Sequence, residues 1–241
     1  MKASPRFDRR LWYGVPLALL AALLLCEPSR LDFALADLFY VQGQGFIGRH
    51  NDFLEDVLHD RAKQLVIAVG VLALAGFLLS LLPGRLRPLR RTLGYLTLAM
   101  GLSTGIVTPL KQATGMHCPW SLEQYGGVER FSPLLGPRAA PVEKAGNCWP
   151  GGHAAAGFAL FALFFALRDH HPRGARGALV AAIGLGTLFS LVRMAQGAHF
   201  LSHNLWTAAL CWLICLGLYD GLLYRPAPAE GMSSHGLDMA G

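Results

Sequence analysis

Long apolar runs separated by short polar segments are the main pattern of this chain. Six such runs stand out, over residues 11–26, 64–82, 92–110, 154–167, 178–192 and 205–223. A helix of about 20 apolar residues crosses the hydrocarbon core of a bilayer. The pattern therefore predicts an all-α integral membrane protein, a six-helix bundle that forms one domain over residues 11–224. Polar tails flank it at residues 1–10 and 225–241, and the second, with its Pro, Gly and Ser residues, is expected to be disordered.

The connections between the runs are of two kinds. Acidic and apolar residues alternate between the first two runs. The spacing of Leu31, Asp32 and Leu35 is typical of an amphipathic helix that lies in the membrane interface, and residues 53–58 repeat it. A long polar loop rich in Gly and Pro occupies residues 111–149, between the third and fourth runs.

Composition and charge support a membrane protein and orient it. Hydrophobic residues make up 53% of the 241 residues and charged residues only 15%. The net charge of +6 comes largely from Arg clusters in the short segments 83–91 and 168–176 and in the N-terminal tail, rather than from one basic stripe. This predicts the bilayer as a partner rather than nucleic acid, and places both termini and these segments in the cytoplasm and the loop 111–149 outside. The oligomeric state stays open.

The first run also has the features of a secretory signal, since a basic segment precedes it. No small-x-small cleavage site follows, because the next residues are Glu27-Pro28-Ser29-Arg30. We therefore interpret residues 11–26 as a retained membrane span in the inner (plasma) membrane.

The segment Asn147-Cys148-Trp149-Pro150-Gly151-Gly152-His153 connects the long loop to the fourth run. Proline is favoured in the first turn of a helix, so a helix is predicted to begin at Pro150. Its first N–H groups lack acceptors within the helix, and the two glycines leave them accessible to an anion. His153 lies beside them, where it could transfer a proton. The alternative is a Gly-rich linker with an interfacial histidine.

Other polar residues are predicted to converge on the same membrane face. Lys111 ends the third run, Arg193 ends the fifth, and His199 precedes the sixth. Charged residues at the ends of membrane spans are candidates for function. Two cations beside free helix N–H groups would bind a phosphate, and two histidines could supply a nucleophile and a proton donor.

These residues form three motifs that resemble those of the type-2 phosphatidic acid phosphatase family, which shares its fold with the vanadium haloperoxidases. The family pattern is K-x6-R-P, P-S-G-H and S-R-x5-H-x3-D. The corresponding residues here are Lys111-x6-Cys118-Pro119, Pro150-Gly151-Gly152-His153 and Arg193-x5-His199-x3-His203. Their order, internal spacing and position at span ends all agree with the family over residues 62–215.

The resemblance implies a role for each of these residues. His199 would attack phosphorus and form a phosphohistidine, and His153 would protonate the leaving oxygen. Lys111, Arg193 and the N–H groups of Gly151 and Gly152 would hold the phosphate oxygens. No metal or cofactor is implied, and the expected substrate is a membrane lipid phosphate or diphosphate.

Four residues depart from the family pattern. Cys118 replaces an Arg, Gly151 a Ser, Val192 a Ser, and His203 the Asp that orients the nucleophilic histidine. A neutral His203 could still accept a hydrogen bond from the His199 ring, without a fixed charge. Other residues could replace the missing anion ligands: His117, Arg130 and Lys144 in the loop, and His59 and Asp60 before the second run. Each of these five residues alone is better explained as a solvated surface residue.

Three other functions remain open on the sequence. A lipid phosphotransferase would use the same site with a second lipid in place of water. A metal-dependent enzyme would use His199 and His203, which share a helix face, with His153 and a cysteine as further ligands. A non-catalytic lipid-binding relative would have kept the fold and lost the chemistry.

Cys118 and Cys148 flank the long loop, whereas the other three cysteines fall in apolar runs. An outward-facing loop meets an oxidising compartment, where a disulfide between these two cysteines is expected to persist. The alternative is two free thiols.

Overall fold

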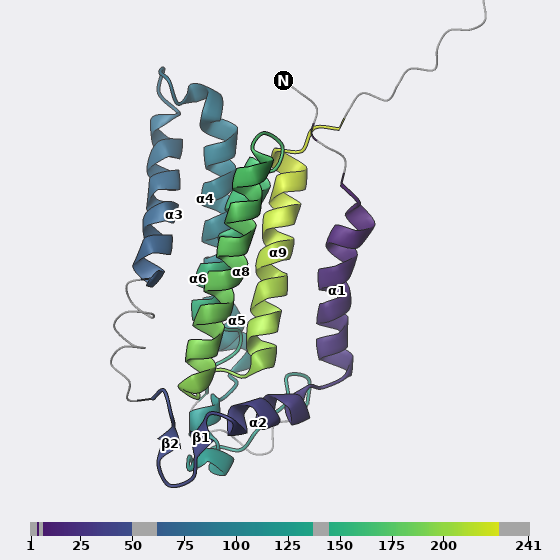
Figure 1. Ribbon diagram of the computed structural model, residues 1–241, viewed down its shortest axis with the longest axis vertical. Helices are drawn as coiled ribbons and strands as arrows, with labels where there is room; N and C mark the ends of the chain where they lie inside the picture. Colours follow the sequence, from purple (N-terminus) through teal and green to yellow (C-terminus); the bar gives the residue numbers. More distant parts are fainter. Residues whose placement is uncertain (1–3, 5–6, 50–61, 137–144, 227–241) are drawn as a thin grey trace, which may run out of the picture.

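A computed structural model of the protein describes residues 4, 7–49, 62–136 and 145–226. Within these ranges the chain is mostly helical, and its long helices run side by side (Figure 1). The helices of the bundle are α1 (Arg9–Leu25), α3 (Ala62–Leu79), α4 (Arg90–Gly105), α5 (Val107–Thr114), α6 (Gly152–Phe158), α7 (Phe161–Leu167), α8 (Pro172–Ala195) and α9 (Leu201–Leu222). Helix α5 follows directly after α4, and α7 follows directly after α6. The predicted all-α class is therefore confirmed for most of the chain.

A layer of short elements covers one end of the bundle (Figure 1). It contains helix α2 (Ser29–Asp37), an antiparallel pair of strands β1 (Tyr40–Val41) and β2 (Gly45–Phe46), and the 3-10 turns η3 (Pro119–Ser121) and η4 (Glu123–Tyr125). A further 3-10 turn, η2 (Arg87–Leu89), precedes α4. The interfacial helix predicted around Leu31 is present as α2, whereas the second one, at residues 53–58, lies outside the described residues. The strand pair was not predicted, because two residues per strand leave no detectable periodicity.

The described residues contain three to four candidate membrane spans, so the predicted count of six is not confirmed. Three helical stretches are long and apolar enough to cross a membrane: Arg87–Ser121, Pro172–Ala195 and Leu201–Leu222. The number rises to four if α1 and α2, which meet at 89°, count as one broken span. Two shorter apolar helices, Gln64–Leu79 and Gly152–Leu167, fall below the required length. Large apolar side chains point outward from several of these helices, for example Leu72 and Val180, as expected for surfaces that face lipid.

The core of the bundle lies where α6 and α7 pack between α4, α8 and α9. Helices α6 and α8 approach most closely at Gly157 and Gly186. A Cβ atom on Gly157 would lie 2.5 Å from the Gly186 nitrogen, and one on Gly186 would lie 2.3 Å from the Phe158 ring. Only glycine fits at this crossing, and small residues commonly permit such close contact between helices in membranes. The crossing fixes α6, and with it the start of the predicted site, against α8.

The predicted start of the fourth-run helix is wrong by two residues. Helix α6 begins at Gly152, with Gly151 as its N-cap, and Pro150 precedes the cap in a cis peptide bond with Trp149. Pro150 therefore ends the loop instead of forming the first helical turn. The first-turn N–H groups belong to Gly152, His153 and Ala154.

The start of α9 is capped by a residue from another helix. Phe200, the N-cap residue, provides no side-chain hydrogen bond. Instead, the buried carboxylate of Asp32 on α2 accepts hydrogen bonds from the Ser202 backbone N–H at 2.9 Å and from the Ser202 hydroxyl. The interfacial layer thereby holds the end of the bundle that carries His199 and His203.

We expect Asp32→Ala to lower the free energy of unfolding by about 1–2 kcal/mol, because it leaves a buried helix N–H without its acceptor. Thermal unfolding in detergent measures this, and turnover should fall as well because α9 carries site residues. Asp8→Ala is the matched control, since Asp8 caps α1 through the N–H groups of Arg10 and Leu11 at the opposite end of the bundle. It should reduce stability without reducing turnover. Full turnover in Asp32→Ala would contradict this role.

Candidate active site

The ammonium group of Lys111 lies at the start of α6. Lys111 belongs to α5, and its Nζ would lie 3.7 Å from a Cβ atom built on Gly152. Any side chain at position 152 would therefore meet Lys111 and Val107. The positive charge and the first-turn N–H groups of α6 face the same space, which is the combination that binds a phosphate.

Arg193, in the last turn of α8, is held in place from two sides. Its Nη1 donates a 2.7 Å hydrogen bond to Oε1 of the buried Gln196. Its guanidinium carbon lies 5.6 Å from the centre of the Trp120 ring, within the range of a cation–π contact. Neither Gln196 nor Trp120 was identified from the sequence.

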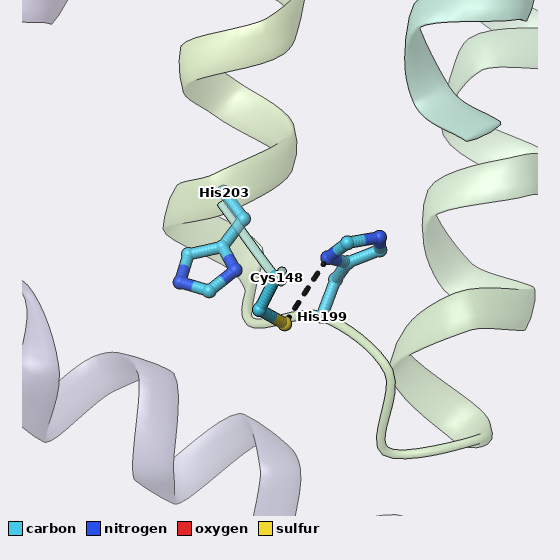
Figure 2. A group of neighbouring side chains, drawn as sticks. All are labelled: Cys148, His199 and His203. Carbon is cyan, nitrogen blue, oxygen red and sulfur yellow. Dashed lines mark hydrogen bonds between the residues drawn. The ribbon is translucent and has the colours of Figure 1, made fainter. Parts of the chain in front are cut away.

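His199 lies in the turn between α8 and α9 and is 3% exposed. Its Nδ1 is 3.5 Å from Sγ of Cys148, which is joined to Cys118 by a disulfide. The same sulfur lies 2.7 Å from the carbonyl oxygen of Ala198. Figure 2 shows the other ring nitrogen of His199 directed away from the sulfur. The disulfide therefore supports one edge of the imidazole and leaves Nε2 on the other side.

His203 does not take over the orienting role of the family's Asp by hydrogen bonding. The His199 and His203 rings are 5.9 Å apart between centres and nearly perpendicular. The buried Nδ1 of His203 has no hydrogen-bond partner among the described residues. The atom beside His199 Nδ1 is the Cys148 sulfur, so the expected hydrogen bond from His199 to His203 is not observed.

The backbone N–H of Gly151 is occupied. It donates to Oγ1 of Thr207 at 2.9 Å, and the Thr207 hydroxyl donates to the carbonyl oxygen of His203 at 2.8 Å. This N–H is therefore already bonded within the protein, and its contact with phosphate stays a prediction, whereas Gly152 lies beside Lys111. A Cβ atom on Gly151 would lie 2.5 Å from Oδ1 of Asn204, so a Ser here would require the Asn204 side chain to move. The spacing His199-x3-His203-x3-Thr207 was the available signal for Thr207.

The electrostatics of the site favour the neutral form of His199. Burial lowers the pKa of His199 well below its usual range. Four neighbouring groups lower it further: His203, Lys111, Arg193 and His153. The unprotonated imidazole keeps its lone pair, and the two cations nearby are suited to a negatively charged phosphate. The predicted residues His153, Lys111, Arg193, His199 and His203 therefore share one region at the end of the bundle.

Cys148, His199 and His203 also have the spacing of a metal site, with donor atoms within 4.8 Å of one another (Figure 2). Cysteine binds metals as a thiolate, and Cys148 is oxidised in the disulfide. The charges of Lys111 and Arg193 act on the same histidine and would repel a cation. The chemistry of this donor set therefore fits a bound metal poorly.

Of the five substitute anion ligands, the two in the described residues contact carboxylates of the loop. Arg130 is exposed and lies 3.6 Å from Glu123. His117 lies 3.5 Å from Glu129 in the loop. Lys144, His59 and Asp60 lie outside the described residues.

Comparison with known proteins agrees with this arrangement. The chain is similar to the lipid A 4'-phosphatase of Francisella tularensis subsp. novicida (strain U112), with 28% identity over 217 residues that cover 88% of this chain and 95% of the relative. No solved structure matches it. The family model of the PAP2 superfamily matches residues 92–226, which is over half of the chain and includes all three motifs. The chain therefore belongs to the PAP2 superfamily.

Proposed function

We propose that this protein removes phosphate from a membrane lipid phosphate or diphosphate through a phosphohistidine on His199. Membership of the superfamily and the similarity to a lipid A 4'-phosphatase make it a phosphatase of lipid phosphates. The proposed phosphohistidine rests on one observation. His199 is buried and neutral, and it lies beside two cations and the open first turn of α6.

The first half of the reaction transfers the phosphoryl group to the enzyme. The disulfide sulfur of Cys148 carries no hydrogen and can only accept from His199 Nδ1, so we assign the proton to Nδ1 and the attacking lone pair to Nε2. The bond from phosphorus to the lipid oxygen breaks, and His153 gives its proton to that oxygen. Lys111, Arg193 and the N–H of Gly152 hold the phosphate oxygens as charge develops on them.

The second half returns the enzyme to its starting state. A water molecule attacks the phosphohistidine and the nitrogen–phosphorus bond breaks. His153 takes the proton from this water, and inorganic phosphate leaves. A second lipid hydroxyl in place of water would give phosphotransfer with the same residues.

A panel of lipid phosphates and diphosphates, assayed with purified protein, tests this proposal. We expect phosphate release that vanadate inhibits, because vanadate occupies a site built for a phosphoryl group in transfer. A chelator should have no effect. Chelator-sensitive hydrolysis would favour the metal-dependent alternative, and binding without any turnover would favour a non-catalytic relative.

We further propose six membrane spans, formed by α1, α3, α4 with α5, α6 with α7, α8 and α9. Both ends of the described chain then lie on one side, as supported by the 2.8 Å hydrogen bond from the Ser4 N–H to the Arg225 carbonyl. The Arg-rich connections lie at the same end, which is cytoplasmic, and the active site faces outward at the periplasmic surface.

A cysteine introduced at Val128, which is 84% exposed in the loop, should react with a membrane-impermeant maleimide in intact cells. The background for this experiment replaces the free cysteines Cys26, Cys211 and Cys215 with Ser. A cysteine at Arg87, in the opposite connection, should react only after permeabilisation. The reverse pattern would contradict the proposed orientation.

A further inference from the structure

A cavity lies beside Trp120, whose ring also contacts Arg193 of the candidate phosphate site. Its volume is about 440 Å³, within the usual range of ligand sites. Arg49, His117, Trp120 and Glu129 provide its polar and aromatic lining. None of these four residues has a role in the proposed phosphoryl transfer.

Trp120 connects the cavity to the phosphate site. The guanidinium of Arg193 lies 5.6 Å from its ring centre, and that of Arg49 lies 5.8 Å from it. The Trp120 backbone N–H donates to the Gly197 carbonyl at 2.9 Å. This hydrogen bond connects the Trp120 side of the cavity to the turn that carries His199. A ligand whose phosphate contacts Arg193 would therefore reach the cavity with the next part of its headgroup.

The walls of the cavity are built by close backbone contacts. A Cβ atom on Gly127 would lie 2.1 Å from the Ser121 carbonyl oxygen, and one on Gly146 would lie 2.2 Å from that of Met116. Gly48, which precedes Arg49, donates from its N–H to the Ala195 carbonyl at the end of α8. These contacts fix the side chains of the lining relative to the end of the bundle.

The charges of the lining decide between two kinds of headgroup. Arg49 carries a positive charge, Glu129 carries a negative charge, and the Nε2 of His117 lies 3.5 Å from the Glu129 carboxylate. A second phosphate would need an excess of cations, and the carboxylate would repel it. A sugar ring suits this mixture, because its hydroxyl groups both donate and accept hydrogen bonds and its C–H groups pack against an indole.

We propose that this cavity, lined by Arg49, His117, Trp120 and Glu129, binds the sugar ring of a glycolipid phosphate whose phosphate group occupies the adjacent site. This proposal rests on the proposed function for the identity of the phosphate site. It makes the enzyme selective for phosphate carried on a sugar over phosphate carried directly on a glycerol lipid.

The test compares two substrates with the same acyl chains in detergent micelles, an acylated hexose phosphate and phosphatidic acid. We expect Glu129→Gln and Arg49→Gln each to lower the ratio of kcat/KM for the hexose substrate over phosphatidic acid by about tenfold, since each removes a charged hydrogen-bond partner. Arg130→Gln is the matched control, because Arg130 lies in the same loop and pairs with Glu123. It should leave the ratio as in the wild type.

A binding measurement separates this proposal from the proposed function. In protein carrying His199→Ala, equilibrium binding of the acylated hexose phosphate should weaken about tenfold when Glu129→Gln is added. Such weakening, together with wild-type protein that releases phosphate from no lipid of the panel, would uphold the sugar site and refute the phosphatase function. Unchanged substrate ratios together with unchanged binding would refute the sugar site, whether or not the enzyme is active.

Discussion

His199→Ala is expected to abolish phosphate release, with a loss of more than about a hundredfold in kcat. The reason is that no covalent intermediate can form without the ring nitrogen, and losses of a nucleophile are typically far larger than this limit. The buried position of His199 between the disulfide and two cations gives water little chance of replacing the imidazole. Phosphate release from the best lipid of the panel measures the effect.

His170→Ala is the matched control for this substitution. His170 is exposed and follows α7 at the end of the bundle opposite the site. This variant should retain wild-type turnover. Both proteins should elute as single folded species in detergent, which excludes unfolding as the cause of the loss. If folded His199→Ala retained more than about a hundredth of wild-type activity, His199 would not be the nucleophile.

Reduction of the Cys118–Cys148 disulfide is expected to affect both stability and turnover. The bridge closes a loop with a sequence separation of 30, and the loop-entropy model gives it about 3–4 kcal/mol. It also places the Cys148 sulfur 3.5 Å from His199 Nδ1, so its loss should disturb the orientation of the imidazole. Turnover should therefore fall at temperatures well below unfolding, through kcat more than through KM.

Thermal unfolding and initial rates, measured with and without a reductant and with mass spectrometry to verify reduction, test this expectation. The double variant Cys118→Ser, Cys148→Ser should behave like the reduced protein. Cys26→Ser should behave like the wild type, because Cys26 is an exposed free thiol. Full turnover after complete reduction would show that the disulfide does not position His199.

Hydropathy and local motifs were sufficient to predict the helices and most of the site. The positions of α8 and α9 follow from apolar runs bounded by polar segments, and Lys111, His153, Arg193 and His199 were identified from fixed local spacings. Such features are encoded by neighbouring residues, so they can be read without knowledge of tertiary contacts.

Contacts between distant segments could not be predicted in the same way. The carboxylate of Asp32 caps α9 by accepting a hydrogen bond from the N–H of Ser202, which lies 170 residues later in the chain. The pairing of Gly151 with Thr207, and of Cys148 with His199, likewise joins segments separated by about fifty residues. Pro150 was misplaced for a related reason, because the conformation of the loop before α6 is set by these contacts and not by the preference of proline for a first helical turn.

The most direct test of the central claim is to trap the covalent intermediate. A lipid phosphate labelled with radioactive phosphorus is mixed with the enzyme, the reaction is stopped within one turnover in alkali, where phosphohistidine survives, and peptides are mapped. We predict label on His199 and its absence in His199→Ala. Turnover without label on any histidine, or label on a residue other than His199, would contradict the mechanism.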